Sequence, residues 1–130
     1  MGSYFKICLF AGQWAKRTGL VHNQNVLNGT GKTMSSELKY KIADKVVFQK
    51  VKAALGMHKC KSFFVAAAPI SFETLEYFMS LDIMIFEIYG MSECSGPQTF
   101  NCKEHVKIGS IGRSLPGIHT KIASKEDEGW

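Results

Sequence analysis

The order of apolar and polar positions predicts two helical regions in the first half of the chain. Residues 4–20 leave a partly apolar helical face that we expect to end near Gly19. Residues 21–36 are mostly polar and contain glycine, which is typical of a loop. Residues 37–58 place apolar side chains along one helical stripe and predict one or two helices, with Gly56 as the stop.

A strand, a helix and a second strand follow, joined by short connections. Residues 62–68 are apolar on both faces and stop at Pro69, which is typical of a strand buried on both sides. Ser71 can cap the helix that follows, and residues 83–88 predict the next strand. In such a βαβ unit the two strands should be parallel and the crossover right-handed. The fold class expected is therefore α/β, a partial parallel-sheet domain, with a further strand over residues 118–123.

Two short segments fall at the carboxyl ends of these two parallel strands. The first is the alanine run of residues 66–68, and the second is Tyr89–Glu93, where a ring, a glycine, a hydroxyl and a carboxylate come together. Open α/β sheets bind their ligands at this edge. We therefore expect both segments to face one crevice.

Each side chain of the second segment suits one part of a nucleotide complex. Tyr89 offers a flat face for a purine, and Gly90 permits close approach of a backbone. Ser92 can donate to a phosphate oxygen, and Glu93 can hold a hard cation such as Mg²⁺. A purely structural alternative remains open. In that alternative Tyr89 fills the core, Glu93 lies in water, and the alanines only pack a strand against a helix.

The composition narrows the class of protein. Four cysteines without paired spacing indicate reduced thiols, so we expect a cytoplasmic protein. The net charge is +5, but only two basic residues are arginines and no aromatic platform accompanies them, which argues against nucleic acid as a partner. The lysines of residues 32–61 are interleaved with helical apolar positions, which is typical of a solvated helix face. Peripheral contact with an anionic membrane is the alternative that this charge leaves open.

Three motifs, in order and with fitting spacing, resemble the adenylate-forming superfamily of acyl-CoA synthetases and their relatives. They are AAAPIS at 66–71, YGMSEC at 89–94 and GSIGRSLPG at 109–117. In finer detail, the first two motifs and their flanks look most similar to the bubblegum-type long-chain acyl-CoA synthetases. The resemblance covers the chain from about residue 8 onward and is weaker before residue 40.

The resemblance implies a two-step reaction. ATP and a fatty acid give an acyl-adenylate and pyrophosphate, and coenzyme A then accepts the acyl group. Ser92 would meet the AMP phosphate, and Glu93 would hold magnesium, so both are implied to act in catalysis. Tyr89 would stack on adenine. The residues implied to bind the nucleotide are Ala67, Ala68, Tyr89, Gly90, Met91 and Ser92.

Some parts of the family pattern have no counterpart in the 130 residues. These are the phosphate loop that precedes the motifs, the ribose-binding aspartate, and the carboxyl-terminal lid domain with its lysine. We therefore expect residues 1–130 to be a partial AMP-binding domain, a fragment of the large N-terminal domain of an adenylate-forming enzyme that is inactive alone. A non-catalytic interaction module of the same fold is the alternative.

Overall fold

The computed structural model describes residues 2–30, 33–102 and 106–122. Within these residues, no helix is both long enough and apolar enough to cross a membrane. Two irregular helical segments, a π-helical turn (Asp44–Phe48) and a 3₁₀ turn (Ser92–Cys94), interrupt the regular elements. The regular elements are α1 (Gly2–Leu27), α2 (Met34–Ala43), α3 (Gln49–Ala54), β1 (Phe63–Val65), α4 (Phe72–Ser80), β2 (Ile85–Met91), β3 (Gly96–Phe100) and β4 (Arg113–Ser114).

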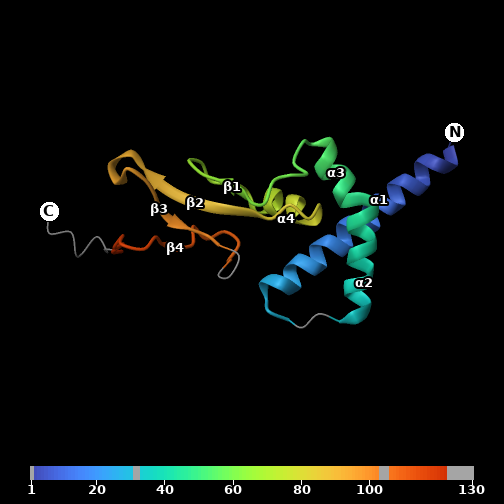
Figure 1. Ribbon diagram of the computed structural model, residues 1–130, viewed down its shortest axis with the longest axis horizontal. Coiled ribbons are helices and arrows are strands. Elements are labelled where there is room, and N and C mark those ends of the chain that lie inside the picture. Colours follow the sequence, from blue (N-terminus) through green and yellow to red (C-terminus); the bar gives the residue numbers. More distant parts are fainter. Residues whose placement is uncertain (1, 31–32, 103–105, 123–130) are drawn as a thin grey trace.

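The helices and the sheet occupy opposite ends of an elongated molecule (Figure 1). Helices α1, α2 and α3 gather at one end, the sheet extends away from them, and α4 lies between. Helix α1 packs against both α2 and α4. Ala15, Ala43 and Phe48 are fully buried where α1 meets the α2–α3 segment, and they form the core of the helical end.

Helix α1 is longer than the sequence predicts. The expected stop at Gly19 and the loop expected from residue 21 are both wrong, because the helix continues to Leu27. Gly19 lies against α4, where a Cβ atom would come within 2.6 Å of the Ser80 carbonyl oxygen. About one turn further on, Asn23 donates to the Met79 carbonyl oxygen over 3.0 Å. This glycine therefore allows two helices to cross closely, and the tertiary contact outweighs its low helix propensity.

The second helical region follows the prediction more closely. Helices α2 and α3 are continuous through the π-helical turn, and α2 begins at Met34, a few residues earlier than expected. Gly56 ends the helix in a left-handed conformation with φ +73°. Its N–H donates to the Ala53 carbonyl, and that of Met57 donates to the Lys52 carbonyl. This pair of bonds is the Schellman motif, so the predicted stop at Gly56 is confirmed.

The βαβ unit is confirmed. Strands β1 and β2 are parallel, with Phe63 opposite Ile85 and Val65 opposite Glu87. Helix α4 connects them, and its N-cap is Ser71, whose hydroxyl accepts the Thr74 N–H over 3.2 Å. The fold class is α/β as expected. It could be predicted because the apolar pattern of the strands and helix, and the cap at Ser71, are local features of the sequence.

The sheet as a whole is only partly parallel. Its order is β1-β2-β3-β4, and both β3 and β4 pair antiparallel to their neighbours. Strand β2 continues to Met91, past the predicted end at residue 88, because β3 folds back and pairs with its last residues. The strand expected over residues 118–123 does not form in its described part, 118–122. The backbone pairs earlier instead, at Arg113 and Ser114.

Strand β1 is not buried on both sides, which corrects another expectation. It is an edge strand of three residues, and the side chain of Phe64 is 49% exposed. Phe64 contacts Phe86 and Phe100, with ring centroids 5.8 and 5.3 Å away. These three rings line a cavity rather than a packed layer, which explains the exposure of β1.

Candidate functional site

The parallel register brings the alanine segment and Tyr89 to one edge of the sheet. Val65 and Glu87 form the last parallel pair. Ala67 lies two residues beyond Val65, and Tyr89 lies two residues beyond Glu87. Both strands run toward the same end of the molecule, away from the helices (Figure 1). The shared carboxyl edge that the sequence predicts is therefore present.

The alanine segment is an exposed turn. Ala66, Ala67 and Ala68 are all exposed, so they do not pack the strand against a helix. Ala67 has φ +73°, a conformation that costs a non-glycine residue about 1 kcal/mol. Such strained positions often occur at ligand-binding turns. The turn presents backbone and small side chains to solvent beside Tyr89.

Tyr89 and Gly90 lie within strand β2 rather than after its end. The Tyr89 side chain is 40% exposed, so it does not fill the core. A register shift between Tyr89 and Gly90 forms a β-bulge opposite β3. At Gly90 a Cβ atom would lie 2.3 Å from the Gly96 carbonyl oxygen. The close backbone approach that this glycine permits is therefore that of the neighbouring strand.

Met91, Ser92 and Glu93 lie at the tip of the β2–β3 hairpin. Met91 is the last residue of β2, and Ser92 and Glu93 begin the 3₁₀ turn that follows it; all three are exposed. At about 3.3 Å per residue, Ser92 lies about 10 Å beyond Tyr89 along the strand direction. The structure thus groups Ala67 with Tyr89 and places the hydroxyl and the carboxylate further out.

The donor set at the hairpin tip suits a magnesium ion only in part. Among the described residues, no three His, Cys, Asp or Glu side chains cluster in a way that could hold a metal ion. Mg²⁺ is, however, commonly held by one or two carboxylates together with water and substrate phosphates. Glu93 alone therefore fits a metal site that a bound nucleotide completes.

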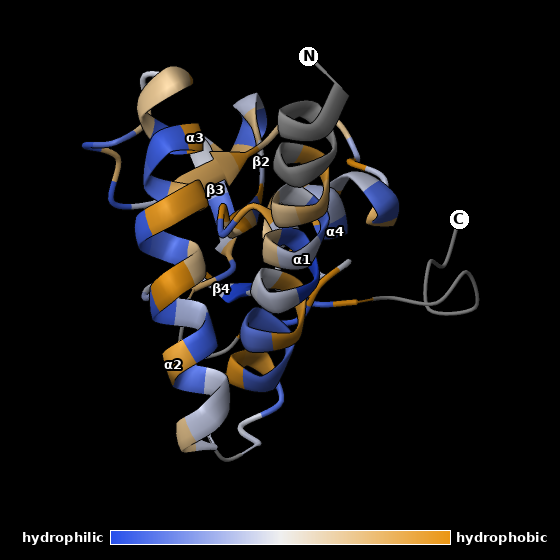
Figure 2. Ribbon diagram, turned by 90° about the vertical axis from the view of Figure 1, so that its right-hand side faces the viewer, coloured by the Kyte–Doolittle hydropathy of each residue, from blue (hydrophilic) through white to orange (hydrophobic). Residues whose placement is uncertain are grey.

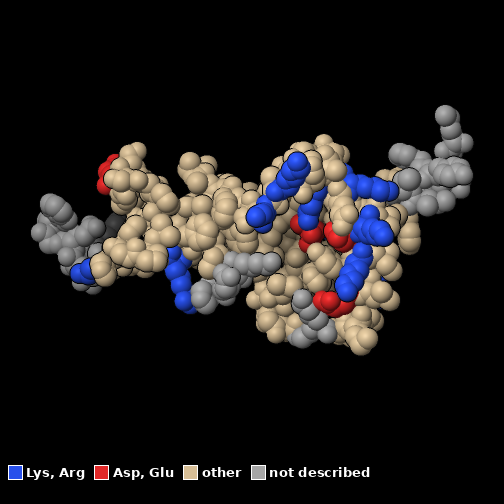
Figure 3. Space-filling view, in the orientation of Figure 1, with Lys and Arg blue, Asp and Glu red and all other residues tan. Residues whose placement is uncertain are grey.

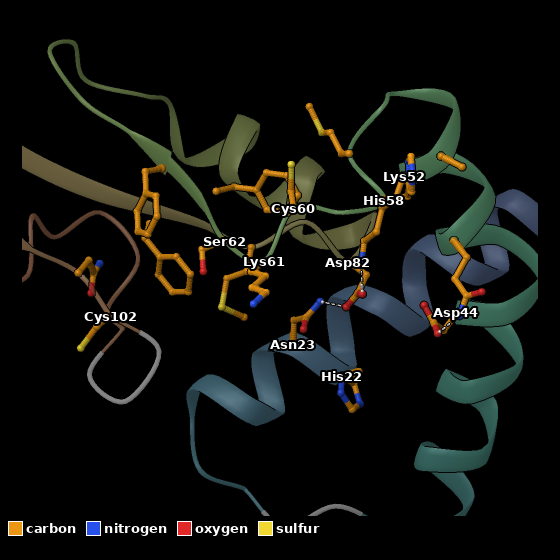
Figure 4. A pocket seen from close by; sticks show the side chains of 18 of the residues that line it. His22, Asn23, Asp44, Lys52, His58, Cys60, Lys61, Ser62, Asp82 and Cys102 are labelled. Carbon is orange, nitrogen blue, oxygen red and sulfur yellow. Dashed lines mark hydrogen bonds and ion pairs between the residues drawn. The ribbon is translucent and has the colours of Figure 1, made fainter.

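The crevice that the sequence predicts at the carboxyl edge is not present among the pockets of the described residues, and a concave region lies instead at the opposite end of the parallel strands (Figure 4). It is an open cavity of about 910 Å³ between the helices and the start of β1. None of the residues that the sequence predicts to bind nucleotide lines it. Aromatic and sulfur-containing side chains form its sheet-side wall, namely Phe63, Phe64, Met84, Phe86 and Phe100.

Asp82 is the centre of the polar wall of this cavity. Its carboxylate accepts hydrogen bonds from the Tyr40 hydroxyl over 3.0 Å and from the Asn23 amide over 3.4 Å. It also forms an ion pair with Lys52, with 2.5 Å between nitrogen and oxygen. Burial raises the pKa of Tyr40 well above its ordinary value, and the negative charge of Asp82 adds to the rise. This network ties three helical segments to the turn between α4 and β2.

Sequence reasoning missed this network. The contributing side chains come from α1, α2, α3 and the α4–β2 turn, and are separated by up to 59 positions. One local feature marks Asp82, its left-handed backbone with φ +60°, but a residue's φ is not visible in the sequence. His22 also belongs here, since its ring stacks on Tyr40 with centroids 3.7 Å apart. In the sequence, these polar side chains cannot be told apart from ordinary solvent-exposed residues.

The βαβ unit, with its alanine turn and its tyrosine strand, is an α/β arrangement, and comparison of the sequence with curated proteins relates it to a class of ligases. The long-chain-fatty-acid–CoA ligase ACSBG2 of Xenopus laevis is 42% identical over 116 residues, which cover 89% of this chain and 15% of that protein. Human ACSBG2 is 38% identical over 116 residues, covering 89% of this chain and 17% of that protein. Bovine ACSBG1 is 38% identical over 98 residues, or 73% of this chain and 14% of that protein.

By sequence, the chain is homologous to one short segment of these bubblegum-type long-chain-fatty-acid–CoA ligases. It spans about 15% of the length of the ACSBG2 relative from Xenopus laevis. No family model matches the chain. No solved structure matches it either.

Proposed function

We propose that this chain forms part of the nucleotide-binding side of a long-chain-fatty-acid–CoA ligase. The observation that carries the proposal is the shared edge of β1 and β2, where Ala67 and Tyr89 each follow the last parallel pair by two residues. The relatives are named as ligases of long-chain fatty acids and coenzyme A. The substrates proposed for the complete enzyme are ATP, a long-chain fatty acid and coenzyme A.

Tyr89 and the alanine turn are the proposed adenine site. The ring of Tyr89 is partly exposed at the sheet edge, and a flat aromatic face stacks well on a purine. Ala67 and Ala68 leave room for a planar base because their side chains are methyl groups. The left-handed turn at Ala67 exposes main-chain groups that can donate to or accept from the base.

Ser92 and Glu93 are the proposed phosphate and magnesium ligands. Their place at the hairpin tip, about 10 Å from Tyr89, is compatible with a nucleotide lying along β2 with its base toward the alanine turn. Ser92 would donate to an oxygen of the AMP phosphate. When bound, magnesium supplies positive charge beside the phosphates, which makes pyrophosphate a better leaving group.

We propose that the 130 residues do not catalyse ligation by themselves. The candidate ligands lie on an exposed edge, and the described residues supply only one carboxylate there. Catalytic groups that act as a unit lose most of their effect when some are missing. We expect no exchange of pyrophosphate into ATP when the chain alone is assayed with a long-chain fatty acid.

The proposed site is tested by titrating the isotopically labelled chain with AMP and Mg²⁺ and recording amide NMR shifts. We expect shifts at Ala67, Tyr89 and Ser92. Tyr89→Leu should abolish them, whereas the matched Tyr77→Leu, at a half-exposed tyrosine on α4, should not. Shifts confined to the cavity around Asp82, or equal losses in both variants, would exclude this site.

The magnesium role is tested separately with Glu93→Gln. The added effect of Mg²⁺ on the AMP-induced shifts should disappear in this variant and persist in Glu73→Gln, a matched exposed glutamate in the first turn of α4. An unchanged magnesium effect in Glu93→Gln removes Glu93 as a ligand and leaves the adenine site standing.

A non-catalytic interaction module is the second candidate function. It is favoured by the exposed edge strand β1, on which Phe64 is half-exposed. An unpaired edge with apolar side chains can add a strand from another chain. Association of this chain with a full-length ACSBG-type ligase that does not depend on nucleotide would support the module, and absence of any such association would exclude it.

A further inference from the structure

The α2–α3 segment carries an exposed line of large apolar side chains. Its four members repeat every four residues, which places them along one side of the helix. On the opposite side, Ala43 and Phe48 are fully buried against the rest of the helical end. The exposed members are Met34 (91% exposed), Leu38 (63%), Ile42 (49%) and Val46 (51%). We call them the apolar stripe.

Lysines border the apolar stripe on both sides. At about 100° per residue, Lys41 and Lys45 fall on one side of the line and Lys39 falls on the other. All three are exposed. Lysine and arginine side chains gather on the helical end of the molecule, as the space-filling view shows (Figure 3). Apolar and polar residues alternate along the same segment in the hydropathy view (Figure 2).

We propose that the apolar stripe and its flanking lysines bind the surface of an anionic phospholipid membrane. An amphipathic helix of this kind lies in the interface, with its apolar residues at the acyl boundary and its lysines among the headgroups. Long lysine stems reach from the apolar boundary up to the phosphates. The helix would lie on the membrane, in keeping with the finding that no described helix is able to cross one.

Charge decides between a lipid surface and a protein partner. The cores of protein interfaces are depleted in lysine, because its flexible charged side chain is costly to order and desolvate. Here Lys39, Lys41 and Lys45 adjoin the stripe along its central turns, so a protein partner would have to cover them. An anionic bilayer instead accepts apolar side chains and lysines together. The proposal concerns a different face from the nucleotide edge and does not depend on the ligase reaction.

The test is co-sedimentation of the whole chain with vesicles. We expect binding to phosphatidylcholine vesicles that contain roughly 30 mol% phosphatidylserine, and at least about tenfold weaker binding to phosphatidylcholine alone. Binding to the anionic vesicles should weaken as salt is raised, since salt screens the lysines. Equal binding to both kinds of vesicle would overturn the proposal.

Two sets of variants assign the binding to this helix. The apolar pair Leu38→Gln with Ile42→Gln, and the charge set Lys39→Gln, Lys41→Gln and Lys45→Gln, should each weaken binding by about tenfold or more. Ile122→Gln is the apolar control, at a side chain that is 94% exposed elsewhere in the chain. Lys107→Gln with Lys121→Gln is the charge control at two exposed lysines. Controls that weaken binding as much as the stripe variants would overturn the assignment.

Folding and self-association are checked in the same samples. The substituted side chains are exposed, so the unfolding midpoint should stay close to that of the unchanged chain. Sedimentation velocity without lipid detects the competing outcome. Self-association that Leu38→Gln with Ile42→Gln abolishes, without vesicle binding by the unchanged chain, would show a protein interface and overturn the membrane proposal. The AMP-induced NMR shifts should be the same in all these variants.

Discussion

The hydroxyl of Tyr40 donates to the carboxylate of Asp82 over 3.0 Å. The two residues are 42 positions apart and link helix α2 to the turn that leads into β2. Lys52 and Asn23 reach the same carboxylate from α3 and α1. The carboxylate of Asp82 thus links three helical segments to the turn that leads into β2, in addition to the packing of α1 on α4.

Tyr40→Phe should change how the stability of the chain depends on alkaline pH. Burial, then the charge of Asp82, raise the pKa of Tyr40, so the folded chain keeps this proton above pH values near 10 where the unfolded chain releases it. The stability contributed by neutral Tyr40 is therefore present at lower pH and lost as the pH rises above about 10. Tyr40→Phe removes this loss while keeping the ring.

Urea unfolding from about pH 8 to pH 11 measures the effect. The stability difference between the unchanged chain and Tyr40→Phe should be constant below about pH 9 and then shift in favour of the variant. Tyr77→Phe, at a half-exposed tyrosine on α4, is the control for loss of a hydroxyl. A flat difference for Tyr40→Phe across the whole range would contradict the assigned burial of this hydroxyl.

Lys52→Met should destabilise the fold more than Lys50→Met. Lys52 pairs with Asp82, and both side chains are largely covered, at 22% and 14% exposed. Removing one partner leaves the other charge without its ion pair, at a cost of about 1–3 kcal/mol. Lys50 is exposed on the same helix, so its replacement should change the free energy of unfolding by less than about 0.5 kcal/mol. Equal costs in chemical denaturation would show that the ion pair contributes nothing.

Ala67→Gly should stabilise the chain even though glycine is usually unfavourable. Relief of the left-handed strain is worth about 1 kcal/mol, and the extra entropy of unfolded glycine offsets about half of it. Ala68→Gly is the control, because Ala68 is not among the described residues with positive φ. We expect it to cost about 0.5–1 kcal/mol. A fall in thermal midpoint of the same size for both variants would argue against strain at Ala67.

Gly90→Ala should be strongly destabilising for a structural reason. Its Cβ would lie 2.3 Å from one backbone oxygen of β3, so the β-bulge and the hairpin would have to shift, at a cost of about 2 kcal/mol. Gly12→Ala is the control, since a Cβ there meets nothing within 4 Å. In the middle of α1 it should stabilise by about 0.5–1 kcal/mol. Chemical denaturation of both variants checks the pair, and a neutral Gly90→Ala would contradict the close strand approach.

Local patterns predicted the parts of the fold that depend on neighbours in sequence. The cap at Ser71, the stop at Gly56 and the parallel crossover each follow from a short stretch of residues. The errors lie where distant segments decide. Gly19 continues a helix because α4 packs on it, and β2 reaches Met91 because β3 pairs with it. Neither partner can be located from the local sequence.

The candidate site also has some features that the local sequence predicts and others that depend on distant segments. The common edge of Ala67 and Tyr89 could be predicted because one crossover fixes both positions. The roles of Ala67, Ala68, Tyr89, Met91, Ser92 and Glu93 stay predictions. The close approach of β3 to Gly90 could not be predicted, since it depends on the hairpin register. The Asp82 network was invisible for the same reason.

The π-helical turn Asp44–Phe48 sets the rotational phase of the helix on either side of it. In a regular α-helix, positions 40 and 52 would point about 120° apart, since each residue turns the chain by about 100°. A π turn absorbs one residue, which reduces this angle to about 20° and lets Tyr40 and Lys52 point at one acceptor. Deleting a single residue between 44 and 48 would therefore restore an ordinary helix and leave Tyr40 and Lys52 about 20° apart, still directed at the same acceptor.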